Sequence, residues 1–107
     1  MKKIILMLVS VLVINACTST KNVPFNEVEA SLNQKYGALS NEYYKMLENP
    51  IVEKDRKSML GKFESFRTEV KDLKKNRKDQ TADETRVFNS FIDKSSTNIQ
   101  YLNDLAE

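Results

Sequence analysis

The sequence predicts an all-α fold, an antiparallel three-helix bundle of coiled-coil-like character that follows an N-terminal signal helix. Three observations support this prediction. Apolar residues recur with a helical period in three stretches of similar length, short polar turns separate the stretches, and no alternating strand pattern competes with them. Because short turns favour antiparallel neighbours, we expect one small helical domain over residues 26–107.

The first segment, residues 1–16, has the layout of a secretory signal peptide. Lys2 and Lys3 give it a cationic start, and apolar residues run from Ile4 to Val9 and from Val11 to Ile14. As a helix this run is roughly 16 Å long, which is too short to cross a bilayer core of about 30 Å. We therefore interpret it as a signal segment that is removed from the mature protein.

The end of this segment, Ile14-Asn15-Ala16-Cys17, resembles the lipobox of bacterial lipoproteins. The resemblance implies that the Cys17 sulfur receives a diacylglyceryl group, that the chain is cut before Cys17, and that the new amino terminus is acylated, for example with palmitate. Two or more such chains anchor a protein stably, whereas one binds marginally. By the same resemblance, Thr18 in place of Asp favours the outer membrane if the host has one. The alternative is a plain signal peptide followed by a buried structural cysteine.

Residues 17–25 are expected to form a polar tether that reaches at most about 25–30 Å. The first helix is predicted from Asn26 to Glu48, with Asn26 and Glu29 as a capping box. Gly37 interrupts this helix, as either a site of close helix crossing or a tolerated weakness. The apolar side chains that share one face of the helix are Phe25, Val28, Leu32, Tyr36, Leu39, Tyr43 and Leu47.

The second helix is predicted from Pro50 to Arg77, because proline suits the first turn of a helix. Its heptad seam consists of Val52, Met59, Phe63, Phe66, Val70 and Leu73. Arg56 and Arg77 occupy two further places on the seam, and we expect both to reach solvent. The same heptads leave open a longer coiled-coil assembly between chains.

The third helix is predicted from Ala82 to Leu105, after a capping box formed by Thr81 and Glu84. Its apolar stripe consists of Phe88, Phe91, Ile92, Ile99, Leu102 and Leu105. Ser95 is the polar exception on this stripe. It marks either a notch that contacts a ligand or a small residue that allows close packing, and we prefer the second interpretation.

Composition argues against an enzyme. The chain has no histidine, its one cysteine is expected to carry lipid, and its two glycines are isolated, so we expect no catalytic residues, no metal site and no cofactor. The formal net charge is +2, from 17 basic and 15 acidic residues, and removal of Lys2 and Lys3 leaves fifteen of each. A near-neutral mature chain does not favour a nucleic-acid partner.

If Cys17 anchors the chain, an up-down-up bundle places the start of the first helix, the end of the second and the start of the third near the membrane. The cations at that end are Lys71, Lys74, Lys75, Arg77 and Lys78. They form either a solvated face that complements the helix dipole or a surface that faces anionic head groups. At the opposite end, Tyr44 and Ile51 are either partner-binding residues or ordinary surface residues.

These features predict a membrane-anchored lipoprotein of the bacterial cell envelope that acts as a binding or scaffold protein, in an accessory or adhesion-related role. Its partner would be another protein of the envelope. In general style it is similar to small helical adhesins of anaerobic bacteria, which are exported, helical and polar. The alternative is an envelope inhibitor, immunity factor or chaperone that captures a soluble protein. A structural lipoprotein that forms homo-oligomers through the second helix is a third possibility.

Overall fold

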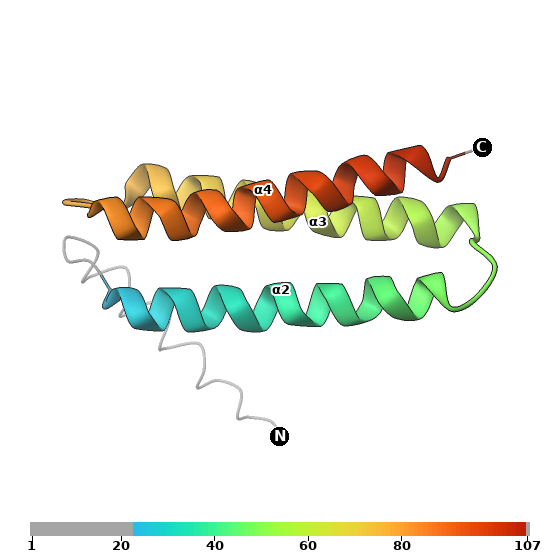
Figure 1. The fold of residues 1–107 in the computed structure, drawn as a ribbon, viewed down its shortest axis with the longest axis horizontal. Helices are drawn as coiled ribbons and strands as arrows, with labels where there is room; N and C mark the ends of the chain where they lie inside the picture. The colour runs from blue at the N-terminus through green and yellow to red at the C-terminus, as the bar shows by residue number, and fades with distance from the viewer. Residues whose placement is uncertain (1–22, 107) are drawn as a thin grey trace, which may run out of the picture.

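The computed structural model describes residues 23–106, and these residues form an all-α fold (Figure 1). The helices are α2 (Phe25–Leu47), α3 (Glu53–Asn76) and α4 (Ala82–Asp104), with no strand within residues 23–106. The predicted three-helix bundle is thereby confirmed. The signal peptide, Cys17 and most of the tether lie outside the described residues, so the statements about them stay predictions.

The three helices run up, down and up, as expected from their short connections (Figure 1). The start of α2 lies at the same end as the turn between α3 and α4, and we call this the proximal end. The turn between α2 and α3 lies beside the end of α4 at the opposite, distal end. The helices α3 and α4 are the most closely packed pair, and α2 packs chiefly on α3.

Buried side chains from all three helices form two adjoining clusters. The proximal cluster consists of Leu32, Phe66, Val70, Phe88 and Phe91. The distal cluster consists of Tyr43, Met59, Phe63, Ile99 and Leu102. Tyr36 and Leu39 pack against both clusters and join them into one core. Every member of the two clusters lies on an apolar stripe or seam predicted from the sequence, because helical spacing alone brings these positions to one face.

The starts of the helices agree with the sequence only in part. The capping box of Thr81 and Glu84 is present at the start of α4, as predicted. The predicted capping box of Asn26 and Glu29 is wrong, because α2 already begins at Phe25 and Pro24 takes the N-cap position without a side-chain bond. Phe25 is held there by an edge-on contact with Phe88, with ring centroids 5.4 Å apart.

The second helix begins later than predicted. Pro50 and Ile51 belong to the turn, and Val52 is an extended residue whose carbonyl accepts the bond from the Arg56 N–H. The start at Glu53 places two acidic residues, Glu53 and Asp55, in the first turn, where the helix dipole favours negative charge. The helix ends at Asn76, one residue before the predicted end.

The two arginines on the seam of α3 are withdrawn from solvent, which corrects the prediction that both reach it. Arg56 is 6% exposed, and the side chain of Arg77 is 11% exposed. Each guanidinium has a carboxylate and a backbone carbonyl as partners, which compensate for its partial or full removal from water. The arginines therefore connect the helices at the two ends of the bundle.

Candidate functional site

Exposed apolar side chains gather at the distal end of the bundle. Among the described residues, eight large hydrophobic side chains are exposed, and six of them belong to the end of α2, the turn that follows it and the end of α4. We call these six the distal patch: Tyr44, Leu47, Ile51, Val52, Tyr101 and Leu105. The other two, Val23 and Leu73, lie toward the proximal end.

Two tyrosines give the distal patch its largest exposed side chains. Tyr44 is 62% exposed and Tyr101 is 55% exposed. The ring of the buried Tyr43 contacts Phe63 in the core and Tyr44 in the patch, with centroids 5.9 Å and 5.8 Å apart. Burial raises the pKa of Tyr43, and the charges of Tyr44 and Tyr101 raise this pKa further. Tyr43 therefore stays neutral at physiological pH.

Arg56 fixes the geometry of the distal end. Its Nη1 donates to the Leu102 carbonyl at 3.1 Å, and its Nε donates to Glu53 Oε1 at 2.9 Å. The Arg56 guanidinium, chiefly through this hydrogen bond, holds the pKa of the Glu53 carboxyl below its usual range. One buried side chain thus ties the last turn of α4 to the first turn of α3. The patch residues on α4 are therefore held in place beside the turn.

Sequence reasoning located part of this patch. Tyr44 and Ile51 were predicted as partner-binding residues, and both are exposed at the distal end; their role in binding stays a prediction. The sequence missed Tyr101, which lies outside the apolar stripe of its helix and gives no periodic signal. It assigned the remaining three members, Leu47, Val52 and Leu105, to buried faces. Leu47 is the last residue of α2, Val52 precedes the first residue of α3 and Leu105 follows the last residue of α4, so all three lie where their helices begin or end.

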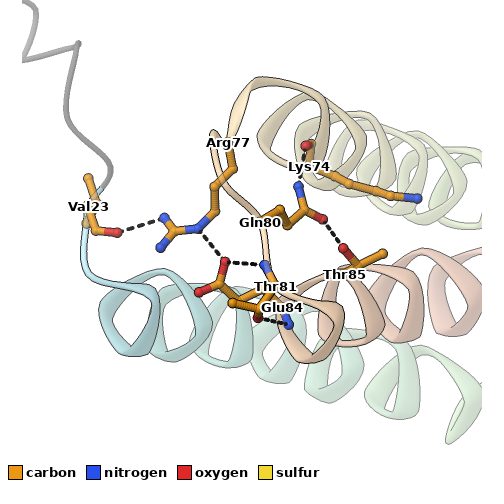
Figure 2. A network of polar contacts seen from close by, with 7 residues as sticks. All are labelled: Val23, Lys74, Arg77, Gln80, Thr81, Glu84 and Thr85. Atoms are coloured by element: carbon orange, nitrogen blue, oxygen red, sulfur yellow. Dashed lines mark hydrogen bonds and ion pairs between the residues drawn. The ribbon is translucent and has the colours of Figure 1, made fainter.

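The predicted basic residues at the proximal end have several different environments. Arg77 lies in a polar network in which its Nη1 donates to the Val23 carbonyl at 2.7 Å and its Nε donates to Glu84 Oε1 at 3.1 Å (Figure 2). The guanidinium also lies over the Phe25 ring, 5.2 Å from its centroid. This network joins the start of α2, the end of α3 and the start of α4.

The remaining cations, Lys71, Lys74, Lys75 and Lys78, extend the same proximal region. Lys71 and Lys75 are exposed, whereas Lys74 is half-buried and donates to Asn89 Oδ1 at 2.7 Å. Lys78 also has an interaction partner. The five cations therefore do not form one uniform surface, because Arg77 bonds to Glu84 and the Val23 carbonyl within the bundle.

Within residues 23–106, no cluster of three or more His, Cys, Asp or Glu side chains is placed to bind a metal ion. Of α2, α3 and α4, none combines the length and the apolar character that a membrane crossing requires. Comparison with known proteins gives no match to a family model, to a curated protein or to a solved structure.

Proposed function

We propose that this protein is a lipid-anchored binding or scaffold protein of the bacterial cell envelope, attached through Cys17 and contacting a protein partner through the distal patch. The observation that carries the proposal is the position of the patch. Of the eight large hydrophobic side chains that are exposed among the described residues, six lie at the end opposite the point where the chain enters the bundle. A clustered apolar surface on a small protein is typical of an interaction site.

The chemistry of the distal patch suits a protein partner. Tyrosine is enriched at protein interfaces because it offers a large, rigid contact area with one polar group. Tyr44 and Tyr101 supply this area from two helices, and Leu47, Ile51 and Val52 extend it around the turn. Because α2 has 23 residues, the patch stands about 35 Å from the proximal end. An anchor at Cys17 would therefore leave the patch clear of the head groups.

A photoreactive amino acid at position 44 tests the proposal in intact cells. Position 33 is the matched control, because Asn33 is exposed on the same helix but lies outside the patch. We expect position 44 to crosslink to one membrane-associated protein and position 33 not to crosslink to it. Equal labelling from both positions would contradict a role for the patch, and a soluble protein crosslinked from position 44 would favour the alternative inhibitor, immunity or chaperone function.

Variants then measure the contribution of the two tyrosines. Tyr44→Ser combined with Tyr101→Ser should reduce recovery of the partner at least tenfold, since truncated aromatic residues at interface centres commonly cost about 2 kcal/mol or more. Val23→Ser removes an exposed apolar side chain at the proximal end and should leave recovery unchanged. If the Val23 variant loses the partner equally, the contact is not specific to the distal patch.

The anchor requires a separate measurement. Mass spectrometry of the native amino-terminal peptide should find Cys17 as the first residue and lipid on its sulfur, and an unmodified Cys17 would refute the anchor. Fractionation and protease accessibility of intact cells test the outer-membrane location and the exposed face.

Sedimentation of the mature chain tests whether it forms a homo-oligomer, and a monomer would argue against assembly through the heptads of α3.

A further inference from the structure

A basic groove lies between α3 and α4 near the proximal end. Its volume is about 630 Å³, and it is lined by Lys71, Lys74, Lys75, Gln80, Thr85, Asn89 and Ile92. These lining residues, all within the described part of the chain, include three lysines and no carboxylate. We call this surface the three-lysine groove.

The opposite side of α3 has a different charge. The charged residues that line the groove between α2 and the last turns of α3 are two carboxylates, Glu69 and Asp72, and one cation, Arg77, whose charge is paired with Glu84. Lys71 and Lys75 repel each other as like charges at i and i+4. Within residues 23–106 neither has an ion-pair partner. The positive potential is therefore concentrated on the side of α3 that faces the three-lysine groove.

Local hydrogen bonds give this groove a defined shape. The Gln80 side chain donates to the Lys74 carbonyl at 2.8 Å and accepts from the Thr85 hydroxyl at 2.6 Å (Figure 2). Lys74 Nζ lies 2.7 Å from Asn89 Oδ1, so its ammonium group is directed toward α4. Ile92 adds an apolar wall. An anion bound here would meet lysines on one side and an amide and an apolar side chain on the other.

We infer that the three-lysine groove binds the phosphate of an anionic phospholipid in the membrane that holds the chain. This inference rests on the proposed anchor at Cys17. Five residues lie between Cys17 and Val23, which limits the distance between these two to about 20 Å when the chain is extended. Lys74, Gln80 and Thr85 of the groove lie at the same end of the bundle as Val23, so the anchor would keep the groove near the head groups (Figure 2). Lysine is a common phosphate ligand, and its charge complements the lipid. Arg77 takes no part, because its partners are Val23 and Glu84.

Vesicle sedimentation tests this inference without the lipid anchor. The probe is the mature chain, residues 17–107 with Cys17→Ser, which keeps every buried core residue, and circular dichroism confirms the helical fold of each variant. We expect binding at low salt to phosphatidylglycerol vesicles but not to phosphatidylcholine vesicles. The triple variant Lys71→Gln, Lys74→Gln, Lys75→Gln should bind up to about 100-fold more weakly, since each lysine near an anionic surface contributes about fivefold.

A matched triple variant separates the groove from overall charge. Lys45→Gln, Lys54→Gln and Lys57→Gln remove the same net charge from the distal half of the bundle. This variant should bind as the unsubstituted chain does. An equal loss of binding in both triple variants, or no loss in the first, overturns the inference.

A single substitution addresses the groove more closely. Asn89→Asp places a carboxylate beside Lys74 and should weaken vesicle binding about fivefold, as the loss of one lysine would. Asn41→Asp adds the same charge on the exposed face of α2 and should have little effect. If the two variants behave alike, the groove is not the binding site. Because the probe carries no lipid, these results are independent of the chemistry at Cys17 and of the distal patch.

Discussion

Replacement of Ser95 by alanine should stabilise the bundle. Ser95 is fully buried on α4, and its hydroxyl has no hydrogen-bond partner within the described residues. A buried polar group without a partner costs about 1–3 kcal/mol, and the alanine side chain has nearly the same volume. Alanine also has the higher helix propensity, by about 0.5 kcal/mol. A net gain of about 2 kcal/mol would raise the melting temperature by about 8–16 °C in a domain of this size.

Thermal and denaturant unfolding of the mature chain measure this gain, and Ser90→Ala is the matched control. Ser90 is exposed on the same helix, so its replacement changes propensity but not the burial of a hydroxyl. Ser95→Ala should exceed Ser90→Ala by at least about 1 kcal/mol in the free energy of unfolding. Equal gains would show that the Ser95 hydroxyl finds a partner. A loss of stability in Ser95→Ala would refute the reasoning and would favour a role for this hydroxyl at a site.

Three further predictions concern charge and glycine. The pKa of Glu53 is lowered, so the stability from its bond to Arg56 is present above the ordinary value of 4.5 and is lost as the pH falls through the lowered pKa. Denaturant midpoints measured down to about pH 3 should therefore depend less on pH in Glu53→Gln. Arg56→Gln should lower the free energy of unfolding clearly more than Arg86→Gln, because Arg86 forms a similar but exposed pair, and similar losses would argue against the bond to α4. Gly37→Ala and Gly61→Ala should each raise the free energy of unfolding by about 0.5–1 kcal/mol, because a Cβ at either position meets open space. Denaturant unfolding measures this change, and a lower stability would indicate a close contact at that glycine.

Local signals predicted the structure where local interactions determine it. The capping box at Thr81 needs only Glu84, three residues away, and the structure contains it as predicted. The start of α2 depends instead on Phe25, which packs on Phe88 more than sixty residues later in the chain. A pattern of residues that are close in the sequence cannot reveal a contact between residues so far apart along the chain. The capping prediction at Asn26 therefore failed although its own logic was sound.

Helical spacing identified the core but not its ends. All ten members of the two core clusters lie at predicted positions, because a position on the apolar face is buried wherever a neighbouring helix covers it. Leu47 and Leu105 follow the same spacing and are exposed, since they lie where the bundle ends. Three of the six patch residues, Leu47, Val52 and Leu105, continue a predicted stripe or seam, and Tyr101 lies outside all of them. The sequence therefore identified only Tyr44 and Ile51 as candidate contact residues, and the exposure of the others depends on the lengths and alignment of all three helices.

Two arginines on the seam of α3, the buried Arg56 and the half-buried Arg77, hold the two ends of the bundle together. Arg77 bonds to the Val23 carbonyl and to Glu84, so the point where the chain enters α2 is fixed against α3 and α4. Arg56 fixes the end of α4 against the start of α3 through the Leu102 carbonyl. Fraying of the distal end would break the buried contact of Arg56 with the Leu102 carbonyl, and fraying of the proximal end would break the partly buried pair of Arg77 and Glu84. These contacts keep the three-lysine groove and the distal patch at opposite ends of the bundle, as the proposed function requires.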